Sequence, residues 1–147
     1  MANFFLDNED IQFLLQHIDV RELARIQEDD FLDLASRPDY APRDVEEAVD
    51  NYRRVLEIIG QVAGDTIAPN AEDVDAEGNT LNEDGTVTYH PKVAENLKRL
   101  AQADLMGFTL PYKYGGLNCP NLIYTVATEI VSRADGSLMN LFGLQGI

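Results

Sequence analysis

The sequence predicts an all-α fold: a helical bundle of about six helices with one short β-hairpin. Apolar residues recur every three or four positions over most of the chain, most clearly at 45–63 and 122–134. The periodicity fails only at 70–90, between the longest helix and the next, where Glu83-Asp84-Gly85-Thr86 is typical of a tight turn between two strands. The chain of 147 residues has the length of one domain.

Residues 1–40 are predicted to form an N-terminal helical extension of three short helices. Asp7 is expected to cap the first helix, and Asp19-Val20-Arg21-Glu22 resembles a capping box for the second. Residues 31–35 would form a third helix that ends at Pro38, because the residue before a proline disfavours helical geometry.

The longest predicted helix begins at Pro42, since proline suits the first helical position, and is expected to stop at Pro69. The segment 70–90 should then be irregular apart from the hairpin. Pro91 is expected to open the next helix, which ends near Gly107.

The final two helices follow a tight turn at 114–118. The first runs from Pro120 to Ala134, and Ser137 is expected to cap the second. This last helix has no charged residue and is apolar on every side, so we expect it to be buried under a cover from outside the chain. Its apolar residues are Leu138, Met139, Leu141, Phe142, Leu144 and Ile147.

Two motifs occur in a fixed order in this C-terminal stretch. Leu110-Pro111-Tyr112-Lys113-Tyr114-Gly115-Gly116 is similar to a Pro-x-x-Tyr-Gly-Gly turn, and Glu129 with Ser132-Arg133-Ala134-Asp135 is similar to a Glu-x-x-Ser-Arg-Ala stretch. Both belong to the N-terminal helical domain of acyl-CoA dehydrogenases, which the chain resembles from about Pro42 onward. Each motif is weak by itself, and their order and spacing carry the resemblance.

The resemblance has two departures in the turn. Tyr112 and Lys113 replace acidic residues that are common there, and Asn118 replaces a common glycine. Asparagine tolerates positive φ better than most residues, so we expect the turn to be kept. The extra N-terminal helices and the hairpin resemble the larger bacterial branch, which includes methylmercaptopropionyl-CoA dehydrogenase-like enzymes.

The resemblance implies that residues 41–147 are one domain of a larger flavoprotein, an oxidoreductase of fatty acid metabolism. Such an enzyme converts acyl-CoA to enoyl-CoA by moving a hydride from the β-carbon to FAD, and passes the electrons to an electron-transfer flavoprotein. In the family, a middle β-domain and a C-terminal helical domain hold the FAD, and the C-terminal domain supplies the catalytic glutamate. The resemblance therefore implies no catalytic or cofactor-binding residue in this chain, no activity by itself, and an intact enzyme that is a homo-oligomer.

What the resemblance does assign to this domain is part of the wall of the acyl pocket. The helix after the Ser-Arg-Ala stretch lines that pocket in the family. Carried over by position, the substrate-binding residues are Leu141, Leu144 and Gln145. The alternative is that all three belong to the core. Gln145 favours the pocket, because an uncompensated amide in a core is costly.

Charge and cysteine content limit the other partners. The net charge of −15 argues against nucleic acid and anionic membranes, because both require basic patches. Neither a signal peptide nor a membrane span is recognisable at the N-terminus. Cys119 is the only cysteine, which is consistent with a cytoplasmic protein.

The sequence leaves three alternatives to this assignment. Asp73-Val74-Asp75-Ala76-Glu77-Gly78 resembles the start of a calcium loop, but Asp84 is too short for its last ligand, so no metal is expected. Cys119 could pair with His17 or His90 as a nucleophile, although a packed thiol is the simpler expectation. The chain could also be a free-standing helical interaction module. A reading frame that continues into further domains would favour the dehydrogenase.

Overall fold

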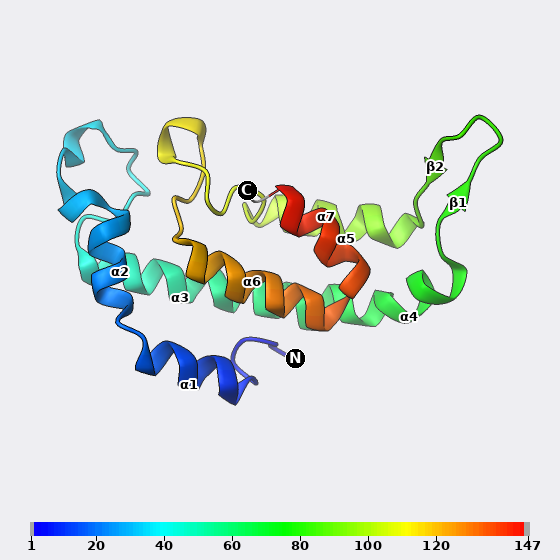
Figure 1. Cartoon of the computed structure of the whole chain (residues 1–147), viewed down its shortest axis with the longest axis horizontal. Helices are drawn as coiled ribbons and strands as arrows, with labels where there is room; N and C mark the ends of the chain where they lie inside the picture. The colour runs from blue at the N-terminus through cyan, green and yellow to red at the C-terminus, as the bar shows by residue number, and fades with distance from the viewer. Residues whose placement is uncertain (1, 146–147) are drawn as a thin grey trace.

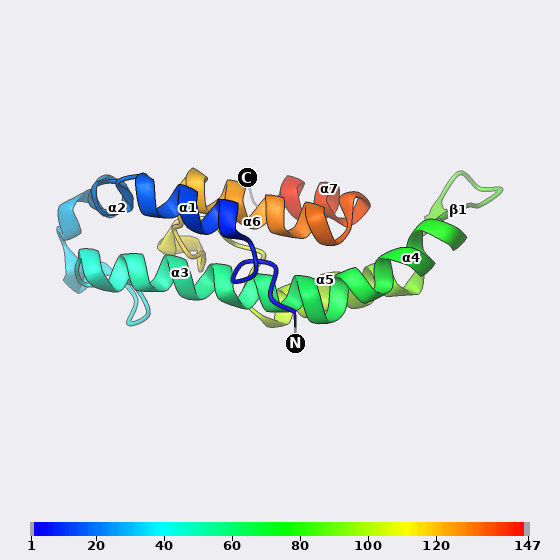
Figure 2. The same cartoon turned by 90° about the horizontal axis from the view of Figure 1, so that it is seen from below.

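The computed structural model describes residues 2–145, with only the backbone of Gln145, and these residues form an elongated bundle (Figure 1). Figure 2 shows two layers, with α1, α2, α6 and α7 in one and α3, α4 and α5 in the other. The predicted all-α fold with one hairpin is confirmed, and seven α-helices occur within 2–145. They are α1 (Glu9–His17), α2 (Val20–Gln27), α3 (Val45–Val62), α4 (Ala68–Glu77), α5 (Pro91–Gln102), α6 (Asn121–Ala134) and α7 (Gly136–Gln145).

The N-terminal segment lies in a groove that two glycines of the α3 region leave open. The amide of Phe4 donates to the carbonyl of Gly60 at 3.0 Å. A Cβ on Gly60 would lie 2.2 Å from Oδ1 of Asn3, and a Cβ on Gly64 would lie 2.3 Å from the carbonyl oxygen of Ala2. These two positions therefore require glycine. Phe5, Ile11 and Ala24 of the N-terminal region are buried in the same core as α3 and α6.

Two expectations for the N-terminal helices were wrong. Asn8, not Asp7, caps α1, because the side chain of Asn8 accepts a hydrogen bond from the amide of Ile11. The third helix is replaced by two 3₁₀ turns, Asp29–Phe31 and Leu34–Ser36. Four residues in and between these turns, Asp29, Asp30, Phe31 and Asp33, have left-handed φ values, which excludes a regular helix. Asp19 caps α2 as predicted.

The predicted limits of the longest helix were also wrong. The helix begins at Val45 rather than Pro42, because Asp44 is extended and its side chain accepts from the amide of Glu47. The carboxylate of Glu47 accepts in turn from the amide of Arg43. The two side chains thus provide hydrogen-bond acceptors for two backbone amides at the start of the helix, those of Arg43 and Glu47.

Pro69 does not stop the helix. Between α3 and α4 the chain makes a π-turn, Ala63–Ile67, in which the amide of Ala68 donates to the carbonyl of Ala63. The wider turn accommodates Pro69, which an ordinary α-helix would exclude by a clash with the preceding turn. As a consequence residues 70–77, expected to be irregular, are helical.

The hairpin is confirmed. Strands β1 (Thr80–Leu81) and β2 (Val87–Thr88) are antiparallel, with Leu81 opposite Val87. The amide of Gly85, which has a φ of 81°, donates to the carbonyl of Asn82 and closes the turn. Figure 1 shows that the hairpin projects beyond α4 and α5 at one end of the molecule.

The last helix is only partly buried. Asp135, not Ser137, provides the cap, because its carboxylate accepts from the amides of Ser137 and Leu138. Leu138 and Phe142 are buried, whereas Leu144 is 74% exposed. The side of the helix that carries Leu144 is therefore not covered by the described residues, and its cover from outside the chain stays a prediction. Ile147 lies outside the described residues. None of the described helices has both the length and the apolar character that a membrane span needs.

Candidate functional site

A groove of about 480 Å³ runs between α6 and α7. Its wall from α6 is mostly polar, and its wall from α7 combines apolar side chains with one amide. The lining residues are Tyr124, Thr125, Thr128, Glu129 and Ser132 of α6, and Met139, Asn140, Gly143 and Leu144 of α7. We call this feature the α6–α7 groove.

The shape of the α6–α7 groove depends on a contact between its two helices. The hydroxyl of Tyr124 donates to the carbonyl of Gly143 and joins α6 to α7. Behind this contact the rings of Phe108 and Phe142 meet edge to face at 6.0 Å. A Cβ on Gly143 would have ordinary contacts, the nearest at 3.6 Å from the sulfur of Met139. A side chain here would therefore fill the groove rather than disrupt the fold.

The predicted pocket residues lie in different places. Leu144 lines the α6–α7 groove, with most of its side chain exposed. Leu141 is half-buried, packs against the core and is not a lining residue. The side chain of Gln145 lies outside the described residues. Sequence reasoning missed Asn140 and Gly143. Asn140 lies four residues before Leu144 and Gly143 lies four residues after Met139, so each shares one side of α7 with a lining residue.

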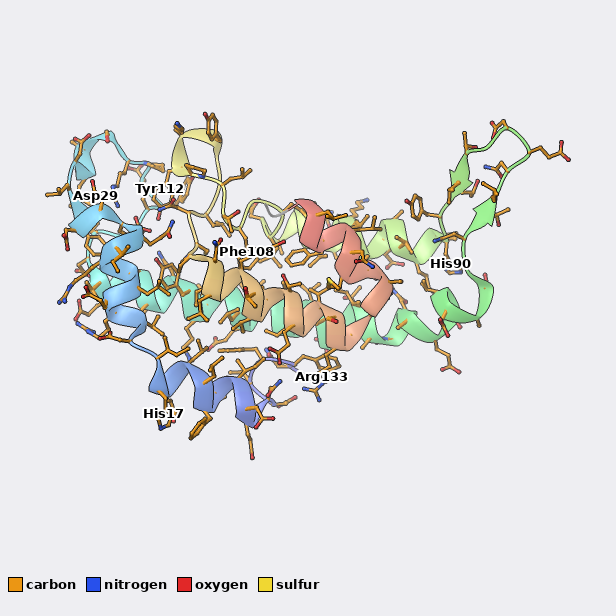
Figure 3. All side chains as sticks on the ribbon, in the orientation of Figure 1. His17, Asp29, His90, Phe108, Tyr112 and Arg133 are labelled. Atoms are coloured by element: carbon orange, nitrogen blue, oxygen red, sulfur yellow. The ribbon has the colours of Figure 1, made fainter. Side chains whose placement is uncertain are left out.

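A second polar site, also missed, anchors the Tyr-Gly-Gly turn to the N-terminal region. Glu28 is only 1% exposed. Its carboxylate accepts from Nη1 of Arg37 at 2.7 Å, from the hydroxyl of Tyr112 at 2.8 Å and from Nδ2 of Asn118 at 3.2 Å. Figure 3 shows Tyr112 on the turn that faces the Asp29 loop. We call these four residues the Glu28 network.

The Glu28 network holds the turn in the conformation that the sequence suggested. Asn118 has a φ of 52°, as expected for the residue in place of glycine. The pKa of Tyr112 lies well above its usual value, mainly because the phenol is buried and also because it is hydrogen-bonded to Glu28. The phenol therefore stays protonated and remains a hydrogen-bond donor. Tyr40 adds a further bond from its hydroxyl to the carbonyl of Gly116 at 3.2 Å.

The possible nucleophile pair of Cys119 with a histidine is not assembled. Cys119 is buried. Its burial, and to a lesser extent the negative charge of Glu28, raises the pKa of the thiol to about 12. A thiol that stays protonated is a poor nucleophile. His17 stacks on Phe13, and His90 contacts Glu77 at 2.9 Å. Figure 3 places the two histidines at opposite ends of the molecule.

Comparison with known proteins decides the family. The family model described as "Acyl-CoA dehydrogenase, N-terminal domain" matches residues 50–147, which are two thirds of the chain. The chain belongs to the acyl-CoA dehydrogenase family. This confirms the resemblance recognised from the Tyr-Gly-Gly turn and the Ser-Arg-Ala stretch, both of which lie within the matched residues.

Three acyl-CoA dehydrogenases illustrate the similarity. The mitochondrial isovaleryl-CoA dehydrogenase of Solanum tuberosum is 32% identical over 94 residues, covering 64% of this chain and 20% of the relative. The 2-methylacyl-CoA dehydrogenase of the same plant is 31% identical over 96 residues, or 65% of this chain and 21% of the relative. The 3-methylmercaptopropionyl-CoA dehydrogenase of Ruegeria pomeroyi is 32% identical over 96 residues, which cover 65% of this chain and 16% of the relative. The chain thus spans about a fifth of the length of the relatives it matches.

Acyl-CoA dehydrogenases are flavoproteins, but the α6–α7 groove lacks the groups that would hold FAD. The groove offers the carboxylate of Glu129 and no lysine or arginine among its lining residues. The pyrophosphate of FAD needs cationic groups or helix N-terminal amides, and the groove does not fit it. Across residues 2–145 there is no cluster of three histidine, cysteine or acidic side chains that could hold a metal ion.

Proposed function

We propose that the chain is the N-terminal domain of an FAD-dependent acyl-CoA dehydrogenase, and that it supplies part of the wall of the acyl pocket. The intact enzyme would carry out α,β-dehydrogenation of an acyl-CoA to an enoyl-CoA. The α6–α7 groove carries this proposal, because it is the concave site in the matched region whose wall includes one of the predicted pocket residues, Leu144.

The character of the α6–α7 groove supports an acyl ligand. Met139 and Leu144 give it apolar surface, and Gly143 leaves space where a side chain would intrude. We include Asn140 with Leu144 in the proposed wall. Leu141 does not line the groove, so its place in the acyl pocket, like that of Gln145, stays a prediction from the family resemblance alone.

The remaining functional assignments rest on the family. We propose that FAD and the catalytic base are held elsewhere in the intact enzyme, so that this chain is not catalytic by itself. We also propose a homo-oligomeric, cytoplasmic enzyme of fatty acid metabolism that passes electrons to an electron-transfer flavoprotein. The length of the relatives supports a larger protein over a free-standing interaction module.

The test is Leu144→Trp in the intact enzyme. If Leu144 faces the acyl chain, the larger ring should shorten the preferred substrate, because each methylene removed from the pocket forfeits about 0.8 kcal/mol. We expect kcat/KM across a series of acyl-CoA lengths to fall for long chains, with little change for short chains or in thermal stability.

The control is Leu81→Trp, at a leucine on the hairpin that is as exposed as Leu144. It should leave the chain-length profile unchanged. A uniform loss of activity in Leu144→Trp across all chain lengths, with a lowered melting temperature, would show that Leu144 is only a packing residue.

A further inference from the structure

The dipeptide Asp-Gly occurs at two places in the chain, Asp84-Gly85 and Asp135-Gly136. It permits a backbone reaction, because glycine has no side chain to hinder attack of its own nitrogen on the carboxyl carbon of the preceding aspartate. The nitrogen bonds to that carbon and one water molecule leaves, which gives a succinimide ring. One water molecule then opens the ring at either carbonyl, so the product is aspartate or isoaspartate.

The two aspartates share one local hydrogen bond. Oδ1 of Asp84 accepts from the amide of Thr86 at 3.0 Å, and Oδ1 of Asp135 accepts from the amide of Ser137 at 2.8 Å. In each case the carboxyl group is folded back along the backbone of the intervening glycine, whose nitrogen is the nucleophile. A difference in reactivity between the two sites must therefore come from their surroundings.

Asp84-Gly85 lies at the tip of the hairpin, which projects beyond α4 and α5 (Figure 1). Both residues are exposed, and a Cβ on Gly85 would meet no atom within 4 Å. The nitrogen of Gly85 donates to the carbonyl of Asn82 at 3.0 Å, so the turn must open before the ring can close. That opening has a low cost, because each strand has only two residues and a two-stranded hairpin is marginally stable in water.

Asp135-Gly136 is held by the core instead. Asp135 is 8% exposed, and its carboxylate also accepts from the hydroxyl of Ser137 and from the amide of Leu138. Ring closure there would unfold the first turn of α7 and expose Leu138, which is fully buried. Exposure of a buried leucine makes an opening less frequent by about tenfold or more, so Asp135 should react more slowly than Asp84 by that factor.

We propose that Asp84-Gly85 is a site of isoaspartate formation. An isoaspartyl residue continues the backbone through its side-chain carbonyl carbon, which adds one methylene to the chain and frees the α-carboxylate. That carboxylate is the group that an isoaspartyl methyltransferase esterifies with the methyl group of S-adenosylmethionine. The added methylene also disrupts the turn between Asn82 and Gly85, which fixes Leu81 opposite Val87. The site does not rest on the proposed dehydrogenase function.

The test is to age the purified chain for several weeks at body temperature and neutral pH. Trypsin separates the two sites, because it cleaves after Arg54, Lys92 and Arg133 and so yields the peptides 55–92 and 134–147. The separated peptides are then labelled with isoaspartyl methyltransferase and tritiated S-adenosylmethionine. We expect the label in 55–92 to increase with age and to exceed that in 134–147 by about tenfold or more.

The variant Asp84→Ser assigns the label. Serine can still accept from the amide of Thr86, as Asp84 does, but it cannot form the ring. The variant should lose the label in 55–92 and leave that in 134–147 unchanged. The proposal is overturned by absence of label in 55–92 of the aged chain, by equal label in the two peptides, or by label in 55–92 that persists undiminished in Asp84→Ser.

Discussion

Replacing Arg37 by methionine should cost far more stability than replacing any surface arginine. The side chain of Glu28 is 0% exposed and that of Arg37 is 14% exposed, so the pair is almost entirely removed from water. Without Arg37, the carboxylate keeps only the neutral donors Tyr112 and Asn118. Leaving a buried charge without its counterion costs about 3–5 kcal/mol. That is a large share of the roughly 5–15 kcal/mol that stabilise a typical domain.

Urea unfolding followed by circular dichroism measures the loss. The matched control is Arg25→Met, because Arg25 pairs with Glu22 on α2 with both side chains about half exposed. Such a pair contributes about 0–1 kcal/mol. Glu28→Gln should be intermediate, because the Arg37 left behind retains some contact with water. If Arg37→Met costs no more than Arg25→Met, the Glu28 network is not the anchor described above.

Two further predictions concern backbone space and alkaline pH. Gly60→Ala should lower the free energy of unfolding by about 1–3 kcal/mol, because its Cβ would overlap Asn3 and Phe5. Gly136→Ala, whose Cβ meets no atom, should be neutral or stabilising. Equal effects of the two variants in urea melts would contradict the close packing of the N-terminal segment against Gly60. The pKa of Cys119 rises from 9.0 to about 12 on folding, so its contribution to stability is intact below pH 9 and is lost as the pH rises toward 12. Cys119→Ser should flatten the decline of the free energy of unfolding, measured by urea melts between pH 9 and 11, by up to about 1.4 kcal/mol per pH unit. An unchanged slope would show that the thiol is not the group responsible.

The parts of the fold that follow from local periodicity were predictable. The stripes at 45–63 and 122–134 each specify a helix regardless of what lies around it, and both helices are present. The caps were misplaced where two capping residues stand close together, as with Asp7 and Asn8, or Asp135 and Ser137. Either member of such a pair can accept from a helical amide, so local sequence does not distinguish them.

The Glu28 network shows what local reasoning cannot reach. Glu28 and Tyr112 are 84 positions apart, and each alone is typical of a solvated side chain or a turn residue. Their pairing depends on the tertiary arrangement that brings α2 to the Tyr-Gly-Gly turn. The α6–α7 groove was predictable only in part. The family resemblance indicated α7 and Leu144, whereas Gly143 is recognised as part of the wall only in the structure, where α6 lies beside it.

The π-turn at Ala63–Ile67 has a geometric consequence for the far end of the molecule. It holds one more residue than an α-helical turn, and one residue corresponds to about 100° of rotation around a helix axis. The turn therefore resets the angular phase of α4 relative to α3. The phase it sets brings Asn70 to Asn96 of α5, where the two amides share a hydrogen bond of 2.8 Å. The direction in which the hairpin points is thus determined more than ten residues before its first strand.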